Sequence, residues 1–534
     1  MKNNRTFETR GPVNSTDNYV VERQTEIADL VNKIKQGRYI VIFAPRQTGK
    51  TTFFRWALSA LVAEDNRYLP IQLDFEAYKN ISVSAFYGYF HQDICQEIRN
   101  HFSLSQTEPP ETLLHWLENS SITDHVSMIG FFGQLSNYLT NRRIVIIIDE
   151  FDGIPTDTVS DFLYSLRRIY LSSTQPKCPY SLGIIGVKNL TQLNYDRSIS
   201  PFNIQDDFAL PNFTLSQVQE LLGQYTKEVG QAFAADVIQR LHQQTAGQPF
   251  LVNRMAQILT EVMDMPSSLM ITHEHFELAH EQILDEPNVH LSHLATNVRK
   301  NRRFESLLMR IISYETGVRF NIRDEAISEL ATYGVLKKGS DGLCEIANPI
   351  YQYCIAQTFQ PTINGLEQQY LPEETQAGFF DYLTPDGQIN LRELLTNFRD
   401  FIARAGFSIL QIPETPQEFV GQYLLFAYLD TFVRQVRGFM YLEVRTGRGR
   451  MDLIILHQHS KYIVETKIWE GKSFYQKGKR QLAAYLKLES VSEGYYVVFD
   501  HRQKPQPRQD EDTIDGKTIV SYVIPVLQQK PSSQ

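Results

Sequence analysis

Apolar residues along the first third of the chain alternate between uninterrupted runs and a helical spacing. The runs at 39–43, 68–74, 143–150 and 181–187 predict β-strands. The run at 143–150 is too uniformly apolar for a strand with one exposed face, so it predicts a central strand of a parallel sheet that is covered on both sides. Residues 22–36 place their apolar side chains on one helical face. Strands that alternate with helices predict an α/β fold with a doubly wound parallel sheet.

The pattern changes after this region. Residues 214–264 predict helices that are interrupted at Gly247. Residues 303–350 predict three helices, a glycine-containing turn and a short strand, which is the layout of a winged helix. Residues 361–390 are rich in proline, glycine and acidic side chains and predict a linker, and a second α/β pattern begins near residue 391. Two α/β regions are therefore expected, with a helical region between them.

A polar loop separates the first predicted strand from a segment of helical character. It reads Ala-Pro-Arg-Gln-Thr-Gly-Lys-Thr, which is the pattern of a phosphate-binding loop with alanine at its first position. Gly49 lets the backbone approach phosphates, Lys50 supplies a positive charge, and the Thr51 hydroxyl can bind Mg²⁺. The loop also lies at a helix N-terminus, which favours anions. The predicted nucleotide-binding residues of this segment are Ala44, Pro45, Arg46, Gln47, Thr48, Gly49, Lys50, Thr51 and Thr52.

Two acidic residues, Asp149 and Glu150, end the most apolar run. In a parallel sheet Asp149 would lie at the carboxyl edge, where it joins Thr51 as a ligand of Mg²⁺. Glu150 is suited to orient or deprotonate the attacking water and is therefore a predicted catalytic residue. The loop and this acidic pair together predict binding of ATP or GTP with Mg²⁺.

These motifs, together with residues 18–23, 245–253 and 346–351, resemble the AAA-like ATPases of the AAA+/STAND type. The resemblance covers about residues 5–360 and implies ATP as the nucleotide. It also implies a helical lid in which Gly247 and Pro249 contact the nucleotide.

Other features of these ATPases are less well matched. Asn189 is the candidate for the polar residue that senses the γ-phosphate. The predicted recognition helix at 322–332 carries three acids and one base, so it would repel DNA phosphates, and a packing or regulatory module is the favoured interpretation. No arginine finger is assigned, and the candidates are Arg167, Arg168, Arg197 and Arg299.

Composition and charge narrow the class of protein. The net charge is −9, so contact with nucleic acid requires a local basic patch rather than a chain-wide field. The four cysteines are scattered and predict buried thiols rather than a zinc site. The N-terminus has no apolar signal core, and no apolar run is long enough to span a bilayer. We therefore expect a soluble, cytoplasmic protein with no membrane association.

A second group of candidate residues lies near the C-terminus. Asp452 and Glu465 fall on two consecutive predicted strands that form a hairpin, which would bring both carboxylates to one end. Paired carboxylates suit Mg²⁺, which activates water and stabilises the transition state of phosphodiester cleavage. Lys467 points to the same strand face as Glu465 and can orient the water or neutralise developing charge. Gln481, on the next helix, is suited to face the same site. These four residues are the predicted catalytic group.

This arrangement resembles the PD-(D/E)XK nuclease superfamily over about residues 410–502. Glu418 is similar to the acidic residue of the superfamily's N-terminal helix, and Glu443 is a competing assignment. Basic residues interleaved with aromatic ones suit a polynucleotide substrate. The basic residues are Arg434, Arg437, Arg445, Arg448, Arg450, Lys472, Lys477, Lys479 and Arg480, and the aromatic ones are Tyr441, Trp469 and Tyr475.

The two resemblances together predict a regulatory ATPase that controls a metal-dependent nuclease, a combination that suits prokaryotic defence or DNA processing by analogy. Nucleic acid, with DNA as the expected form, is the predicted partner, and AAA-like domains often form homo-oligomers. The alternative is a signalling or scaffold NTPase whose C-terminal domain binds nucleic acid or protein without cleaving it. The expected domains are 1–213 (AAA-like core), 214–285 (helical lid), 286–360 (winged helix), 361–400 (linker), 401–526 (nuclease-like) and 527–534 (disordered tail).

Overall fold

Two compact units make up the chain, and each is described by itself. The computed structural model describes residues 5–45, 47–104, 108–139, 141–172, 177–186, 204–286, 289–299, 302–313, 317–358, 379–409, 420–443, 451–458, 460–502 and 504–526. The first unit comprises Met1–Ala232, Gly247–Leu269 and Thr332–Gly334. The second unit comprises Phe233–Ala246, Met270–Ala331 and Val335–Gln534.

The first unit is built on a parallel sheet, whose strands within the described residues are in the order β2-β3-β4-β1-β5. Apolar β3 pairs with a strand on each side and is buried along its middle, as the uniform apolar run predicted. The fold class of this region is therefore confirmed as α/β. The strands are β1 Tyr39–Phe43, β2 Tyr68–Asp74, β3 Arg143–Asp149, β4 Ser181–Gly186 and β5 Gln205–Asp207.

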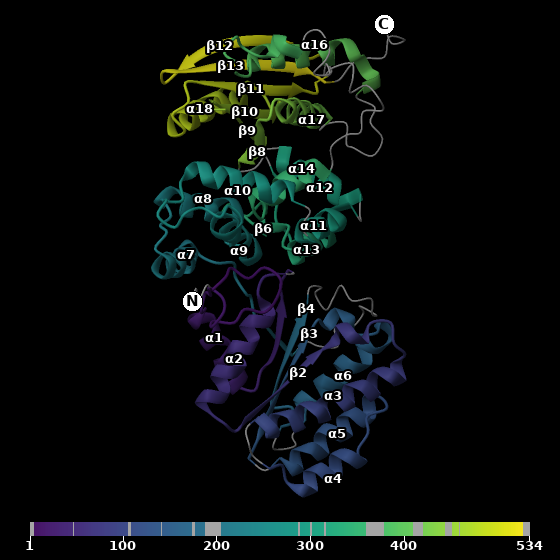
Figure 1. Ribbon diagram of the computed structural model, residues 1–534. Helices are drawn as coiled ribbons and strands as arrows, with labels where there is room; N and C mark the ends of the chain where they lie inside the picture. Colours follow the sequence, from purple (N-terminus) through teal and green to yellow (C-terminus); the bar gives the residue numbers. More distant parts are fainter. Residues whose placement is uncertain are drawn as a thin grey trace. The chain divides into compact units, whose positions relative to one another are not determined.

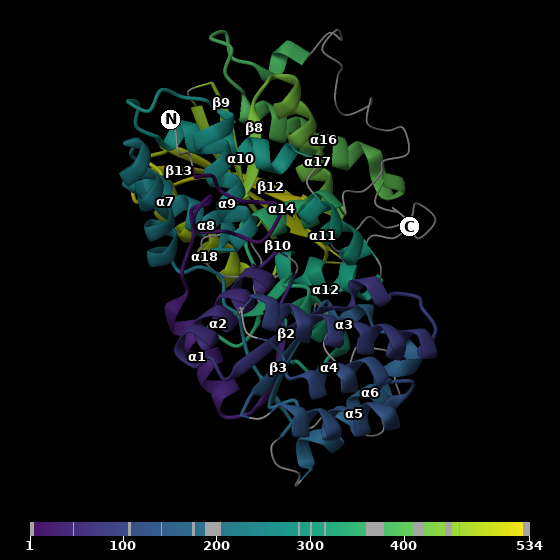
Figure 2. The ribbon, with the colours of Figure 1, turned by 60° about the horizontal axis from the view of Figure 1, so that its bottom comes forward.

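Helices cover both faces of this sheet, as Figure 1 and the turned view in Figure 2 show. Ile40 and Ile42 on β1 pack with α1 Gln24–Lys35 and α2 Lys50–Glu64, whereas Tyr39 and Val41 point to the opposite core. Alternate side chains of one strand thus enter two different cores, so both faces need apolar residues. The helices of the opposite face are α3 Val83–Leu104, α4 Glu111–Asn119, α5 His125–Tyr138 and α6 Val159–Leu171. Short 3₁₀ helices follow β2 and β3, namely η1 Phe75–Tyr78, η2 Phe151–Gly153 and η3 Thr156–Thr158.

The region 214–285, predicted as one helical lid, is divided between the two units. Helices α7 Leu215–Val229 and α9 Pro249–Gln257, with the π-helical turn Ile258–Val262, belong to the first unit. Helices α8 Ala235–Thr245 and α10 His273–Asp285 belong to the second unit, because α8 packs against α10 and α14 Pro349–Thr358.

The predicted winged helix differs from the expectation in one element. Only α12 Arg302–Ser313 and α13 Glu325–Thr332 are helical within the described residues between 303 and the glycine-containing turn. The expected third helix is instead strand β6 Leu336–Lys338, which pairs with β7 Cys344–Ile346 across that turn. Gly334, at φ 72°, ends the helical path and lets Leu336 pair with Ile346. The additional helix precedes this region as α11 Val289–Arg299.

A mixed sheet forms the C-terminal part of the second unit. Its strand order within the described residues is β12-β13-β11-β10-β9-β8, with β10, β11 and β13 parallel and the other pairs antiparallel. The strands are β8 Phe439–Glu443, β9 Met451–His457, β10 Ser460–Ile468, β11 Glu493–Asp500, β12 Arg508–Ile514 and β13 Lys517–Pro525. The helices are α16 Leu391–Ile409, α17 Val420–Gln435 and α18 Lys472–Leu488, preceded by the short 3₁₀ helix η6 Phe379–Tyr382.

The predicted boundary at residue 401 falls inside α16. Phe398 of this helix is buried and its ring lies 6.5 Å from that of Phe499 on β11. Residues 391–400, placed in the linker from their composition, therefore belong with the C-terminal sheet because their apolar face packs on it.

The cysteines and the helices bear on two further expectations. Cys95, Cys178, Cys344 and Cys354 are all free thiols, and all but Cys354 are buried. Burial raises the pKa of the Cys95 thiol to about 11, so it stays protonated at neutral pH. Among the helices of the described ranges, none combines the length and apolar character that crossing a bilayer requires.

Candidate functional site

In the loop between β1 and α2, side chains donate hydrogen bonds to carbonyl groups of the same loop. Gly49 precedes α2 with φ 81°, a left-handed conformation that glycine adopts without strain. The Lys50 ammonium donates hydrogen bonds to the carbonyls of Ala44 at 3.0 Å and Pro45 at 2.8 Å. The Thr48 hydroxyl donates to the same Pro45 carbonyl at 2.9 Å. The loop is thus held in one shape at the N-terminus of α2, and its predicted residue Arg46 lies outside the described residues.

The acidic pair after β3 lies beside this loop. The Thr51 hydroxyl donates to Asp149 Oδ2 at 2.8 Å, which joins two residues 98 positions apart. The other oxygen, Oδ1, accepts from the Glu150 N–H at 3.0 Å. Glu150 itself has φ 47°, a left-handed conformation that is strained for a non-glycine residue. A hydroxyl and a carboxylate at hydrogen-bond distance are oxygen ligands of the kind that Mg²⁺ prefers.

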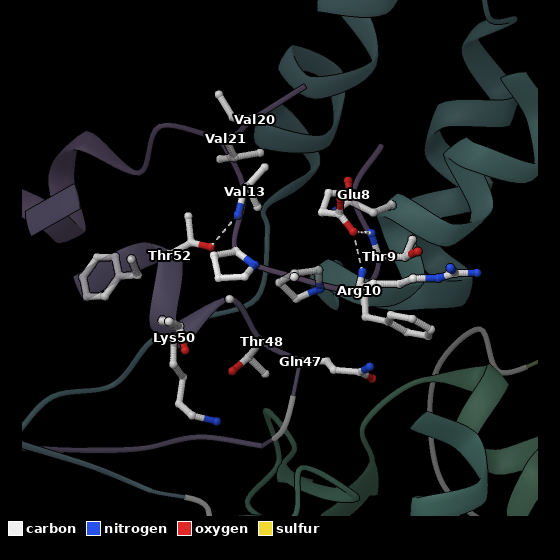
Figure 3. A pocket seen from close by; sticks show the side chains of 18 of the residues that line it. Glu8, Thr9, Arg10, Val13, Val20, Val21, Gln47, Thr48, Lys50 and Thr52 are labelled. Atoms are coloured by element: carbon white, nitrogen blue, oxygen red, sulfur yellow. Dashed lines mark hydrogen bonds between the residues drawn. The ribbon is translucent and has the colours of Figure 1, made fainter. Parts of the chain in front are cut away.

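A cavity of about 430 Å³ lies against the loop (Figure 3). This volume falls within the range of small-molecule sites, about 300–1,000 Å³. Buried Arg23 is one of its polar residues, and burial lowers the pKa of its guanidinium to about 10. The loop contributes Gln47, Thr48, Gly49, Lys50, Thr51 and Thr52, and the apolar lining includes Val13, Val20, Val21, Phe213, Leu221, Pro249 and Phe250.

The N-terminal segment 8–13 also lines the cavity, and the sequence-based prediction missed it. Buried Phe7 fixes one end of this segment through ring contacts with Tyr19 at 4.8 Å. At the other end the Val13 N–H donates to Thr52 Oγ1 at 3.0 Å, as Figure 3 shows. The segment has no periodic pattern, so its only local signal is the single aromatic Phe7 before a polar stretch.

The segment after α8 meets the loop through Gln248 rather than Gly247. The Gln248 amide donates to the Gln47 carbonyl at 3.2 Å, and Pro249 lines the cavity. Gly247 is not among the described lining residues. It has φ 69°, and an added Cβ would lie 1.8 Å from the Phe213 carbonyl oxygen, so glycine is required by backbone packing.

The structure brings none of the other predicted nucleotide contacts into the described cavity. Asn189 and Arg197 lie outside the described residues, as does the side chain of Arg299. Arg167 and Arg168 lie on α6 and are not among the described lining residues.

The second candidate group depends on the strand register of the C-terminal sheet. Asp452 on β9 pairs directly with Glu465 on β10 and, on its other side, with Glu443 on β8. Three acidic positions therefore lie in one row across adjacent strands, as the hairpin predicted for the first two. The backbone places Asp452 and Glu443, whereas their side chains are outside the described part of the structure.

The side chains of Glu465 and Lys467 are both buried, with 3% and 5% of their surface exposed. Lys467 Nζ lies 3.6 Å from Glu465 Oε1, so the two share one strand face as predicted. Gln481 lies half-buried on α18, and Glu418 lies outside the described residues. Among the described side chains, no group of three histidine, cysteine or acidic residues is arranged to hold a metal.

The predicted basic and aromatic rim is partly wrong. The Lys479 side chain is 2% exposed and its ammonium lies 2.6 Å from the carboxylate of Asp512, which is 44% exposed, so Lys479 pairs with an acid of the same sheet rather than forming part of an exposed rim. Arg434 forms ion pairs with Asp430 and Asp285 at 3.1 and 3.0 Å. Tyr441 is buried against α10 with its ring 5.0 Å from that of His280. The structure does not describe Arg445, Arg448 and Arg450.

Two arginines that the sequence-based prediction did not single out complete an aromatic cluster. The Arg502 guanidinium lies 4.6 Å from the centre of the Trp469 ring, and that of Arg508 lies 4.4 Å from the Tyr475 ring. Trp469 and Tyr475 are 5.3 Å apart. Both arginines carry an acidic partner, since Arg502 pairs with Asp500 at 2.6 Å and Arg508 with Asp510 at 3.3 Å.

Comparison with known families gives two matches. The model described as an AAA-like domain matches residues 8–355, and a domain of unknown function, DUF8371, matches residues 390–503. A WD repeat-containing protein of Synechocystis sp., described as uncharacterized, is 22% identical over 241 residues. The match covers 44% of this chain, which spans only 19% of that relative's length.

Three solved structures are similar to this chain at 13–15% sequence identity. The Walker-type ATPase of Pyrococcus abyssi has a TM-score of 0.46 and 13% identity, over 65% of this chain and 99% of that one. The Thermotoga maritima RuvB branch migration motor has a TM-score of 0.30 and 13% identity, over 60% and 91%. The Aeropyrum pernix Orc1 protein, solved in complex with DNA, has a TM-score of 0.29 and 15% identity, over 63% and 93%. At these TM-scores the likeness carries no conclusion about function.

Proposed function

Because the chain belongs to the AAA-like domain family, we propose that its first unit binds ATP with Mg²⁺ and hydrolyses it. The observation that carries the proposal is the 2.8 Å hydrogen bond between Thr51 and Asp149 beside Lys50. Thr51 and Asp149 would hold Mg²⁺, which when bound neutralises charge on the phosphates. Lys50 and the backbone of the loop would bind the phosphates, and Glu150 would take the proton of the attacking water.

Variants of the two acidic residues separate binding from hydrolysis. Asp149→Asn should weaken the Mg²⁺-dependent part of ATP binding, because an amide is a poorer metal ligand than a carboxylate. Glu150→Gln should retain ATP and lose turnover, since the amide cannot accept the proton. Fluorescent ATP binding and phosphate release would be measured with and without Mg²⁺. Full hydrolysis by Glu150→Gln would contradict its role as the base.

We further propose that the C-terminal sheet is a metal-dependent nuclease whose activity depends on ATP. Support comes from the row of Glu443, Asp452 and Glu465 on neighbouring strands, with Lys467 two residues further along β10. Asp452 and Glu465 would hold Mg²⁺, which when bound activates water for phosphodiester cleavage. Lys467 would then stabilise the charge that develops on the phosphate.

A panel of single- and double-stranded DNA and RNA, with and without ATP, tests this proposal. Wild type should cleave at least one substrate in Mg²⁺ or Mn²⁺, and Asp452→Asn should lose cleavage while retaining ATP hydrolysis. A control is Asp386→Asn, which changes an exposed acid of the same unit in a turn that precedes α16. Cleavage by Asp452→Asn at the wild-type rate would rule out the nuclease site.

A specific observation favours a second candidate, a signalling or scaffold NTPase whose C-terminal domain binds without cleaving. Lys467 and Lys479 are each paired with an acid and almost fully buried. Buried lysine charges that a neighbouring acid neutralises are less available to a polyanionic substrate. The same panel distinguishes the two, since this candidate predicts retention of a ligand in binding assays with no cleavage by wild type in either metal.

A further inference from the structure

Two short turns lie side by side at the carboxyl edge of the first unit's sheet. In the parallel register of β2 and β3, Asp74 pairs with Asp149, so both strands end at the same level. Each strand then enters a 3₁₀ helix, η1 after Asp74 and η2 after Glu150. The first side chains of these helices, Phe75 and Phe151, have no exposed surface, and their rings are stacked at 5.8 Å.

The backbone of the two turns is also in close contact. Gly153 of η2 approaches η1 so closely that an added Cβ would lie 1.9 Å from the Phe75 carbonyl oxygen. Asp74 Oδ1 accepts a hydrogen bond from the Glu76 N–H at 2.9 Å, which fixes the start of η1. The turns that carry Glu76 and Glu150 are therefore held side by side by buried rings and by backbone contact.

Glu76 and Glu150 both line the cavity that Lys50 and Thr51 also line. Within the described residues, no hydrogen bond or ion pair involves the Glu76 carboxylate. Two carboxylates on adjacent turns repel each other unless a proton, a cation or a hydrogen-bond donor lies between them. The arrangement is therefore suited to a small donor such as water at the phosphate end of the cavity.

We propose that Glu76 is a further positioning residue for ATP hydrolysis, acting with Glu150 on the attacking water. The inference rests on the proposed ATPase function. The water oxygen forms a bond to the γ-phosphorus while the bond from that phosphorus to the β–γ bridging oxygen breaks. The water proton passes to Glu150, and the leaving electron pair stays on ADP. Glu76 accepts a hydrogen bond from the other O–H of the water, whose hydrogen stays on the oxygen, and this aims the oxygen lone pair at phosphorus.

The role of Glu76 could not be predicted from the sequence, because it depends on strand pairing. Asp74-Phe75-Glu76 matches no phosphate-binding pattern, and Glu76 lies far from Glu150 along the chain. Only the register of β2 and β3 and the stack of Phe75 on Phe151 bring the two acids to one edge.

Glu76→Gln tests the proposal, since glutamine keeps the size of the side chain and removes the negative charge. We expect kcat for ATP hydrolysis to fall at least tenfold, while the Kd for a fluorescent ATP analogue stays within threefold of wild type. Glu76→Asp should recover part of kcat. The double variant Glu76→Gln/Glu150→Gln should be no slower than Glu150→Gln alone, because both residues act on one water. Glu118→Gln, an exposed acid on α4 of the same unit, is the matched control.

The outcomes separate this inference from the proposed function. If wild type hydrolyses ATP and Glu76→Gln turns over at the same rate, Glu76 has no positioning role and the ATPase proposal stands. If kcat and Kd change together, Glu76 shapes the cavity rather than positioning the attacking water, and the inference is wrong. If wild type binds ATP but does not hydrolyse it, both the hydrolysis and the role of Glu76 are excluded.

Discussion

Acidic residues lie at one edge of the first unit's sheet and at one edge of the C-terminal sheet, and the two edges differ in what surrounds their charged side chains. In the first unit, Lys50, Glu76 and Glu150 all line one cavity, and the Lys50 ammonium is held by the carbonyls of Ala44 and Pro45. In the C-terminal sheet of the second unit, Glu465 and Lys467 are packed within the protein and face each other at 3.6 Å. Removing a charge from the first edge should therefore affect ligand binding, and removing one from the second edge should affect folding.

The difference follows from how each edge is assembled. A loop of consecutive residues lines the first site, and the carbonyls of Ala44 and Pro45 accept hydrogen bonds from side chains of the same loop. The second site is formed by the pairing of β9 with β10, and this pairing places Glu465 and Lys467 where they are buried. A buried ion pair contributes little net stability compared with apolar residues, but breaking it leaves an uncompensated charge.

Lys50→Ala should have the largest effect, and it should be on binding. Loss of a charged donor to phosphate costs roughly 3 kcal/mol, which corresponds to about a 100-fold weaker Kd for ATP. Titration with a fluorescent ATP analogue measures this change in Kd. Lys227→Ala, an exposed lysine on α7, is the matched control and should bind as wild type does. Unchanged ATP affinity in Lys50→Ala would show that the loop is not the phosphate site.

Lys467→Met should affect stability instead. It leaves the Glu465 carboxylate buried without its lysine, which destabilises folding by about 3 kcal/mol. Calorimetric unfolding should show a lowered transition for the second unit, with ATP binding retained.

Two further variants sharpen this test. Glu465→Gln/Lys467→Met removes both charges of the pair and should recover much of the lost stability, because neither charge is then buried without the other. Lys472→Met, an exposed lysine on α18, should unfold as wild type does. If Lys467→Met unfolds at the wild-type temperature, the two edges do not differ in the way proposed.

The same contrast explains what could be predicted from sequence. The alternation of apolar runs with helical segments predicted the parallel sheet, and the contiguous loop predicted Lys50 and Thr51 beside Asp149. Segment 8–13 and Glu76 were missed because each reaches the cavity through tertiary pairing, to Thr52 in one case and to η2 in the other. Lys479 was misassigned to a surface rim, since charge on a helix face does not reveal that Asp512 covers it.

The second unit should also lose stability in acid through a buried histidine. His280 is packed against Phe276 and Tyr441, and both of its ring nitrogens lack a hydrogen-bond partner among the described residues. Burial, with a smaller effect of Arg240, lowers its pKa from 6.5 to about 3. Since the unfolded chain binds the proton more readily, stability is complete above about pH 6.5 and falls as the pH drops towards 3.

At pH 5 the expected loss from His280 is about 2 kcal/mol relative to pH 7. His280→Phe keeps an aromatic ring and removes the titrating group, so its unfolding free energy should fall less between pH 7 and pH 5. His501, with a pKa lowered to about 4 by burial, acts in the same direction and remains in both proteins. Equal pH dependence in wild type and His280→Phe would show that the buried ring does not titrate on unfolding.

The smallest effect should come from an ion pair of the first unit that water reaches. Arg5 Nε lies 2.8 Å from Glu228 Oε2, and the two side chains are 29% and 27% exposed. Glu228→Gln should lower stability by less than about 1 kcal/mol, because water already screens the pair. The loss should disappear in 0.5 M salt, where the screening length is below about 8 Å, whereas the effect of Lys467→Met should persist because solvent ions do not reach that pair. If Glu228→Gln loses stability to the same extent at low and high salt, this pair behaves like Glu465 and Lys467. Burial would then not explain the difference between the two ion pairs.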